Sequence, residues 1–280
     1  MFRPPAVLAS AVLLVGLASC GDGTMERTPL PEGIVMHVDQ ARVERKGRQV
    51  FIRVKNTMAE SVTVVGFTMR SSRVSTVRWT GDDVIGAGYE TDLEFDMPLG
   101  RCGNGFTAAV SLTYRIGEGD VRQSIGTADD PYGNIDSLLG RDCAKTTLAS
   151  AAVVTTGMPV VQGVGLRSTL RLPVTLTSTG KLQGVRFGGY ESTVLFRQAP
   201  GSPADVDVFL GRADHPINVD MVVVPSRCDP HALAEDKVGT LFGVKVLADN
   251  VADGASFYLP LTRPQRSAYF AFFSSHCGLD

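Results

Sequence analysis

The stretch LEFDMPLGRC, from Leu93 to Cys102, has a counterpart later in the chain, INVDMVVVPSRC, from Ile217 to Cys228. Both stretches run apolar, polar, apolar, continue through Asp-Met and a short apolar segment, and end in Arg-Cys. Self-similarity of this kind within one chain indicates an internal repeat. The two stretches therefore predict that the chain contains two copies of one structural unit.

The spacing downstream of the two stretches supports the repeat. GFTAAVSL begins at Gly105 and GTLFGVKV begins at Gly239, and from each glycine to the next cysteine, Cys143 or Cys277, the distance is 38 residues. Upstream, VFIRVKNTMAESVTVVGF, from Val50, loosely parallels the segment that begins at Thr169. The order of pattern, glycine and cysteine is thus the same in both copies.

Short runs that alternate apolar and polar residues fill both copies. QVFIRVKN (49–56) and SVTVVGFTMRS (61–71) flank a polar turn, and we expect them to form a hairpin. Similar runs recur about every ten residues, and no long stretch keeps helical periodicity with caps. This pattern predicts an all-β fold of two tandem antiparallel β-sandwiches. It resembles the immunoglobulin-like class, but the Cys…Trp…Cys signature is absent, because the single Trp79 precedes Cys102.

The N-terminal residues predict export. An apolar stretch from Ala6 to Ser19 follows Arg3, and it is shorter than the roughly 20 residues that a membrane-spanning helix needs. It fits the apolar region of a secretory signal peptide. The stretch ends in Leu17-Ala18-Ser19-Cys20, which resembles the lipobox of bacterial lipoproteins. The resemblance implies a signal peptide over residues 1–19, a diacylated Cys20, and a protein anchored by lipid to the extracytoplasmic face of a membrane.

The remaining four cysteines indicate disulfide bonds, because an even number in an exported protein is typical of a cross-linked fold. Four cysteines allow three pairings, and the repeat favours the one in which each copy keeps its own pair. We therefore predict the bridges Cys102–Cys143 and Cys228–Cys277, one in each sandwich. Each closes a loop of roughly 40–50 residues and should stabilise the fold by about 3–4 kcal/mol.

The domain organisation follows from these features. After the signal peptide we expect a flexible tether over residues 20–34, a first sandwich over 35–148 and a second over 149–280, in fixed or semi-fixed contact. The formal net charge is −2, or −3 without Arg3. No basic block interleaved with aromatic residues is present, so the sequence gives nucleic-acid binding no electrostatic support.

One polar stretch, SRCDPHALAED (Ser226–Asp236), contains metal-ligating residue types. Gly239 lies eleven positions after Cys228, whereas Gly105 lies three positions after Cys102. Asp229 followed by Pro230 predicts a helix start, which places His231 and Glu235 on one face of a helical turn. The simpler interpretation is a capped, exposed turn. The alternative is a zinc or copper site formed by His231, Glu235 and Asp229, although such sites need three or four ligands.

A second polar cluster precedes Cys143 and contains oxygen ligands of the kind that calcium prefers. Its residues are Asp129, Asp130, Asn134 and Asp136. Their spacing is not that of an EF-hand loop, and Asp-Asp-Pro-Tyr-Gly-Asn is typical of a solvated turn. A structural role is therefore the first interpretation and calcium binding the alternative.

The motifs of common enzyme classes are absent from the sequence. It contains no G-x-S-x-G, H-E-x-x-H, P-loop or S-x-x-K motif, which favours a protein without catalysis or cofactor. We predict a membrane-tethered lipoprotein that acts as a non-catalytic binding or assembly module of the cell envelope, with an envelope protein or a wall polymer as its partner. The alternatives are an extracytoplasmic protein that handles copper or zinc and a hydrolase of envelope material.

Overall fold

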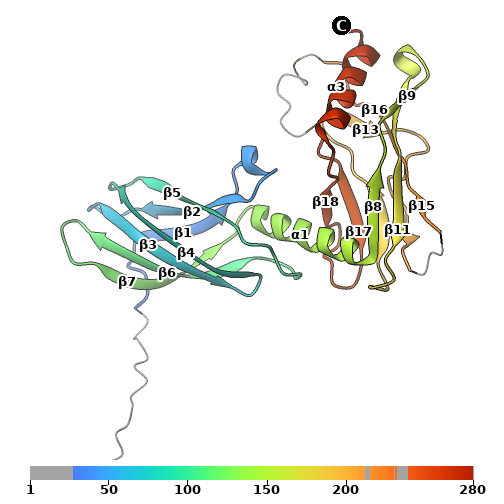
Figure 1. Cartoon of the computed structure of the whole chain (residues 1–280). Coiled ribbons are helices and arrows are strands. Elements are labelled where there is room, and N and C mark those ends of the chain that lie inside the picture. Colours follow the sequence, from blue (N-terminus) through green and yellow to red (C-terminus); the bar gives the residue numbers. More distant parts are fainter. Residues whose placement is uncertain (1–27, 212–214, 230, 232–238, 280) are drawn as a thin grey trace, which may run out of the picture.

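The computed structural model describes residues 28–211, 215–229, 231 and 239–279 of the 280-residue chain. These residues form two mostly β units joined by helix α1 (Figure 1). The first unit contains β1 (Ile34–Asp39), η1 (Arg42–Glu44), β2 (Gln49–Asn56), β3 (Val62–Ser71), β4 (Val74–Ile85), β5 (Glu90–Asp96), β6 (Thr107–Ile116) and β7 (Arg122–Asp129). Helix α1 (Asn134–Ala151) follows.

The second unit is built from shorter strands and ends in a helix. Its elements are β8 (Ala152–Thr156), β9 (Val160–Gln162), η2 (Gly165–Arg167), β10 (Thr169–Leu172), β11 (Val174–Ser178), β12 (Arg186–Tyr190), β13 (Phe196–Gln198), β14 (Val208–Phe209), β15 (Ile217–Asn218), β16 (Met221–Pro225), β17 (Gly243–Leu247), β18 (Ser256–Tyr258) and α3 (Arg263–Cys277). Most strands lie within the alternating runs of the sequence, but β1, β8 and β9 were not predicted.

The strands of the first unit follow the order β4-β3-β6-β7-β1-β2-β5. The contact between β7 and β1 is one parallel pair, His37 with Asp129, and an isolated parallel bridge joins Pro29 to Ile125 of β7. The other strand pairings described in this unit are antiparallel. The sheet therefore bends into two layers, β4-β3-β6-β7 and β1-β2-β5, and the apolar residues of both layers form one core. The result is a sandwich-like all-β unit.

The expected hairpin between β2 and β3 is wrong. Strand β2 pairs with β1 and β5, and β3 pairs with β4 and β6, so the turn between them crosses from one layer to the other. The buried Asn56 explains the crossing, because its Nδ2 donates to the carbonyls of Glu60 and Ile85 at 2.8 and 3.1 Å. Those bonds hold the turn against the layer that contains β3.

Two sheets of the second unit have strand pairings like those of the first, whereas a further sheet, β13-β16-β10-β9, has no counterpart there. As β2 pairs with β1 and β5, so β11 pairs with β8 and β15. As β3 pairs with β4 and β6, so β12 pairs with β14 and β17, and the pair β6–β7 corresponds to β17–β18. Two layers of the second unit, β14-β12-β17-β18 and β15-β11-β8, thus have the strand order of the first unit.

Each unit ends in a helix that the sequence interpretation missed. Helix α1 contains Cys143 and α3 ends at Cys277. The start of α3 has a capping box, in which the side chain of Thr262 accepts from the backbone of Gln265 and the Gln265 side chain reaches back to Thr262. Gly278 closes the helix with a positive φ of 63°. The aromatic run within α3 reads like a strand, which is why this capped helix was not predicted.

Two disulfides join Cys102 to Cys143 and Cys228 to Cys277, with Cα–Cα distances of 5.0 and 5.2 Å. These are the pairings that the repeat predicts. In both units the bridge runs from the loop after one strand to the terminal helix, so that two further strands lie inside each closed loop.

Helix α1 belongs to both hydrophobic cores. Its first two turns supply Ile135, Leu138 and Leu139 to the core of the first unit. Its later turns supply Cys143, Ala144, Leu148 and Ala151 to the core of the second unit. The expected boundary at residue 148 therefore falls inside a helix, and the units share an element where a linker would otherwise stand.

No helix of the described residues is long and apolar enough to cross a membrane. The predicted signal peptide and Cys20 lie outside the described residues.

Candidate functional site

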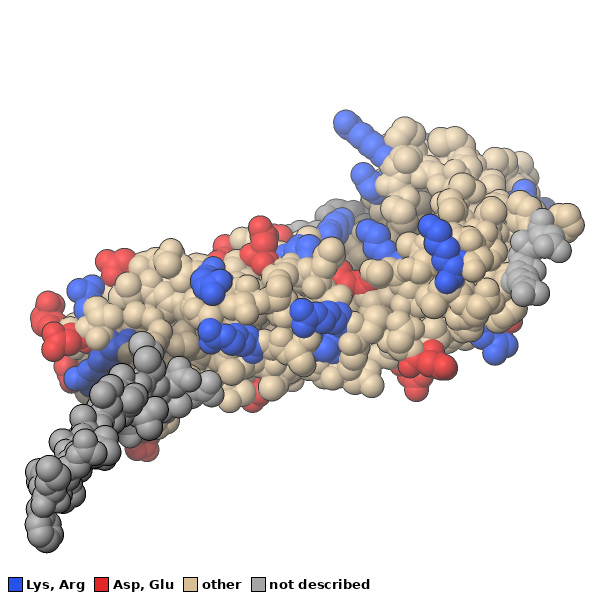
Figure 2. Space-filling view, turned by 60° about the horizontal axis from the view of Figure 1, so that its bottom comes forward, with Lys and Arg blue, Asp and Glu red and all other residues tan. Residues whose placement is uncertain are grey.

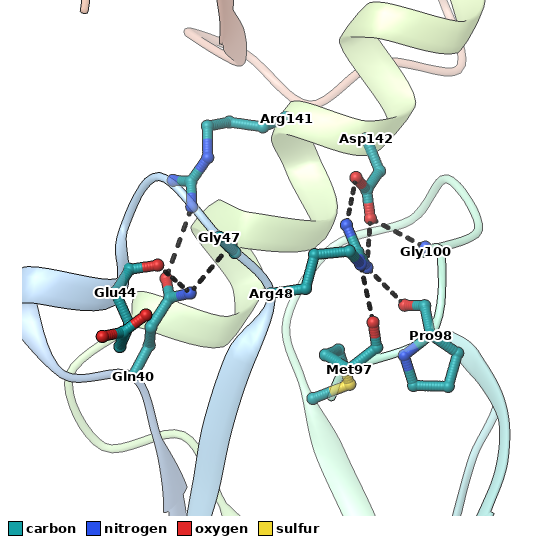
Figure 3. A network of polar contacts seen from close by, with 9 residues as sticks. All are labelled: Gln40, Glu44, Gly47, Arg48, Met97, Pro98, Gly100, Arg141 and Asp142. Carbon is teal, nitrogen blue, oxygen red and sulfur yellow. Dashed lines mark hydrogen bonds and ion pairs between the residues drawn. The ribbon is translucent and has the colours of Figure 1, made fainter. Parts of the chain in front are cut away.

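An ion pair fixes the first unit to helix α1. Arg48, just before β2, directs its guanidinium at Asp142 of α1, with Nη1–Oδ1 and Nη2–Oδ2 distances of 2.7 and 2.9 Å (Figure 3). The Nε of Arg48 also donates to the Met97 carbonyl at 2.6 Å, and the backbone N–H of Gly100 donates to Asp142 at 2.8 Å. The side chains are 30% and 12% exposed. This bidentate, largely buried pair is therefore a geometrically specific clamp.

The loop before β2 is held against the same helix by Gln40. This buried side chain donates to the carbonyls of Glu44 and Gly47 at 3.1 and 3.3 Å, and its Oε1 lies 3.5 Å from a guanidinium nitrogen of Arg141 (Figure 3). Because the loop is bonded internally and to α1, the exposed Arg45 and Lys46 at its tip have a fixed base.

Helix α1 contacts the second unit on its other side. The Arg141 guanidinium lies over the ring of Tyr258 in β18, 5.1 Å from the centroid. In the loop between β17 and β18, Asn250 donates to Thr147 of α1 at 3.1 Å, and its Nδ2 lies 3.4 Å from the sulfur of Cys102. The Cys102–Cys143 bridge therefore lies at the junction of the two units, since Cys143 itself is part of the second core.

These contacts surround a groove of roughly 600 Å³ between the loop before β2, helix α1 and strand β18. Its basic lining residues are Arg45, Lys46, Arg48, Arg141 and Lys145. The single lining carboxylate, Asp142, is already paired with Arg48. Its apolar and aromatic lining includes Leu99, Leu138, Phe257 and Tyr258. The groove thus combines an excess of positive charge with an aromatic wall.

The positive charge of the groove is poorly compensated. Among the described residues, no carboxylate forms an ion pair within 4.0 Å of Arg45, Lys46, Arg141 or Lys145. Burial lowers the pKa of Arg141; Tyr258 and the Asp142 carboxylate oppose this shift, and the like charges of Arg45 and Arg48 add to it. The protein therefore gathers cations here at an electrostatic cost.

The sequence interpretation missed this groove. Its only local signal is the short run Glu44-Arg45-Lys46-Gly47-Arg48, which lies about a hundred residues from the part of α1 that completes the site. Elsewhere the basic residues are dispersed. On the face shown in Figure 2, Lys and Arg side chains lie at several separate places, some of them beside Asp and Glu side chains. That face therefore lacks the continuous basic stripe typical of nucleic-acid binding.

The predicted metal site is described only in part. The Asp229 carboxylate accepts from the backbone N–H of His231 at 2.9 Å, the contact expected of a residue that caps a helix start. Pro230 and Glu235 lie outside the described residues. Within the described part of the chain, no three His, Cys, Asp or Glu side chains are grouped so that they could hold a metal ion. Metal binding by His231, Asp229 and Glu235 stays a prediction.

The four residues of the second polar cluster each have a partner in the protein. Asp129 accepts from Thr107, Asp130 accepts from the backbone of Asp136, Asn134 donates to Asp39, and Asp136 pairs with Arg73. The Asp129 contact joins β7 to β6, and the other three attach the start of α1 to the first unit. These contacts support the structural interpretation, although Asp130 Oδ1 is buried without a hydrogen-bond partner among the described residues. Calcium binding stays the alternative.

Asp130 gives this attachment a pH dependence. Burial raises the pKa of its carboxyl, and the backbone N–H groups at the start of α1, which favour the charged form, offset only part of that effect. Because the folded-state pKa lies above the unfolded one, this group stabilises the fold most at low pH, and its contribution falls as the pH rises through the interval between the two values.

The Asp130→Asn variant should therefore lose less stability than the wild type between acidic and neutral pH, since the amide oxygen can still accept from Asp136. Urea denaturation across this range measures the difference. The exposed Asp129→Asn is the matched control. A steeper pH dependence in Asp130→Asn would contradict the assignment.

The second unit exposes an apolar edge. Strand β9 is the last strand of its sheet, and the segment that follows leads to η2. Val160, Val161, Val164 and Leu166 in this segment are 52%, 53%, 80% and 77% exposed. Edge strands with exposed apolar residues are places where other chains pair.

Comparison with known proteins adds little to these observations. No family model matches the chain, and no curated protein matches it. Among solved structures, one titled "Biofilm associated protein - BSP domain" aligns with 85% of this chain at 10% identity and a TM-score of 0.25. The alignment spans 60% of that protein's length. At this TM-score the likeness supports no conclusion about fold or function.

Proposed function

We propose that the protein is a lipid-anchored, extracytoplasmic binding or assembly module of the cell envelope, and that the groove between its units is the binding site. The observation that carries the proposal is the groove itself: uncompensated cations on a fixed frame, next to an aromatic wall. The two disulfides support an extracytoplasmic address, because such bonds persist in oxidising compartments.

The rigid connection between the two units suits a role in binding. The two units share helix α1 and are joined by the Arg48–Asp142 pair and by contacts to the Cys102–Cys143 bridge. A site between two units that cannot rotate freely loses little entropy when its ligand binds. The described lining holds no histidine or free thiol, and its one carboxylate is clamped, which favours recognition over acid–base catalysis.

We also propose that the two units descend from one duplicated, immunoglobulin-like sandwich. The layers β5-β2-β1 and β4-β3-β6-β7 correspond to the strands E-B-A and C′-C-F-G of that class. The sheets β15-β11-β8 and β14-β12-β17-β18 of the second unit have the same pairings, the sheet β13-β16-β10-β9 is additional, and a helix with the second cysteine follows.

The anchor is tested by replacing the predicted lipid attachment site. The Cys20→Ser variant should lose incorporation of an alkyne-labelled fatty acid and should leave the membrane fraction, because two or three acyl chains are what holds the protein there. The proposal would be contradicted if Cys20→Ser still incorporated the label as the wild type does, and Cys102→Ser/Cys143→Ser lost it instead.

The binding role is tested by crosslinking in intact membranes followed by pull-down. The wild type should capture a reproducible envelope protein or polymer, and the Lys46→Gln/Lys145→Gln variant should capture less of it. Lys55→Gln/Lys181→Gln removes two exposed charges outside the groove and should leave capture unchanged. Absence of any reproducible partner in the wild type would overturn the proposed function.

A further inference from the structure

We propose that the groove binds a linear polyanion, a chain that carries phosphate or carboxylate groups at close intervals. This inference rests on the proposed function, because it names the class of ligand for the same groove. It follows from the number and placement of the cations that line the site, and from the contacts that fix one of them.

The cations come from opposite walls of the groove. Arg141 and Lys145 are four residues apart on α1 and so share one face of the helix. Arg45 and Lys46 approach from the loop before β2. A ligand with one charge would meet only part of this set, whereas a chain with several charges can contact both walls at once. Gathered like charges without counter-charges raise the free energy of the unbound protein, and a polyanion would lower it.

Arg141 is held ready for such a ligand. Its guanidinium donates to the Ser137 hydroxyl at 3.0 Å and lies over the Tyr258 ring, so its position is fixed by protein contacts. The planar fork of a guanidinium matches phosphate and carboxylate oxygens. Lys46 and Lys145 are exposed. An ammonium group attracts anions as a point charge, without the fixed geometry of a guanidinium. The site therefore combines one guanidinium in a fixed position, that of Arg141, with exposed lysines around it.

The shape of the site favours a polymer over a membrane surface. The cations line a recessed groove of roughly 600 Å³ between two units, within the size range of sites that enclose a ligand. A flat anionic bilayer would reach the exposed lysines but not the recessed Arg141. A few repeating units of an anionic chain can enter the groove and lie along α1.

The test uses the mature chain, residues 20–280, with Cys20→Ser so that no lipid takes part. Binding of a short linear polyphosphate and of polygalacturonate is measured by calorimetry at low and at high salt. Vesicles of phosphatidylglycerol serve as the membrane probe. We expect both polymers to bind, with an affinity that falls as the salt concentration rises.

The Arg45→Gln/Lys46→Gln/Lys145→Gln variant should weaken polymer binding by at least about tenfold, since three charge-assisted contacts are lost. Arg141→Gln should weaken it by a similar factor. The control Lys55→Gln/Arg78→Gln/Lys181→Gln removes the same charge from exposed positions outside the groove and should change affinity by less than about twofold. Circular dichroism and a melting curve verify that each variant is folded.

If neither polymer binds at low salt, the inference is wrong. It is also wrong if the control variant loses as much affinity for the polymers as the groove variant does. Binding to vesicles without binding to polymers would overturn it in favour of a lipid headgroup. In a further outcome, the pull-down captures a partner that is lost when the groove lysines are replaced, while neither polymer binds. That result would contradict the polyanion as ligand and would leave the proposed function in place.

Discussion

The Cys102→Ser/Cys143→Ser variant is expected to lose about 3–4 kcal/mol of unfolding free energy, because the bridge closes a loop with a sequence separation of 41 residues. The loss should also affect the relation between the two units. Cys143 is buried in the second core, and Cys102 belongs to a loop of the first unit that Asn250 contacts. Without the bridge, that loop keeps its hydrogen bonds, ion pairs and apolar packing but loses its covalent link to α1.

Two measurements separate these effects. Urea denaturation gives the loss of free energy, and small-angle X-ray scattering gives the spread of overall dimensions at low denaturant. Cys228→Ser/Cys277→Ser is the matched control, since its bridge closes a similar loop with a separation of 49 residues but lies within the second unit. Both variants should be destabilised, and only the first should show a wider spread of overall dimensions in solution. An unchanged profile in the first variant would contradict a role for this bridge at the junction.

The sequence predicted much of the strand architecture because alternating runs have a local cause. Each strand buries one face, so QVFIRVKN and FTAAVSLTYRI could be assigned to strands from their residues alone, and they form β2 and β6. The disulfide pairing was also predictable, because the repeat places two equivalent cysteines in each copy. Which strands pair was not predictable locally, and the crossing at Asn56 depends on a buried amide that the pattern does not distinguish from a turn residue.

The helices and the groove escaped prediction for different physical reasons. In α1, Gly140 and several Thr and Ser residues lower the helix propensity, and its apolar residues face two different cores, so no single apolar stripe stands out. The groove is assembled from residues about a hundred positions apart. Its charge excess exists only once α1 has brought Arg141 and Lys145 next to the loop that contains Lys46.

The second large effect is expected at the clamp between the first unit and α1. In Arg48→Ala, the Asp142 carboxylate keeps its bond from Gly100 but loses its counter-charge while it is only 12% exposed. We expect a loss of about 2–3 kcal/mol in unfolding free energy, below the 3–5 kcal/mol typical of fully buried pairs, because Arg48 is partly exposed and solvent screens the pair.

A double-mutant cycle tests whether the loss comes from the unpaired charge. When Arg48→Met is combined with Asp142→Leu, no buried charge is left without a partner, so the double variant should be more stable than Arg48→Met alone. Urea denaturation of the four proteins gives the coupling energy, and Arg115→Met, which removes an exposed pair with Asp82, should cost less than about 1 kcal/mol. If the double variant loses as much unfolding free energy as the two single variants together, the residues do not act as a pair. The stabilisation would then come from the separate hydrogen bonds of Arg48 to the carbonyls of Met97 and Pro98.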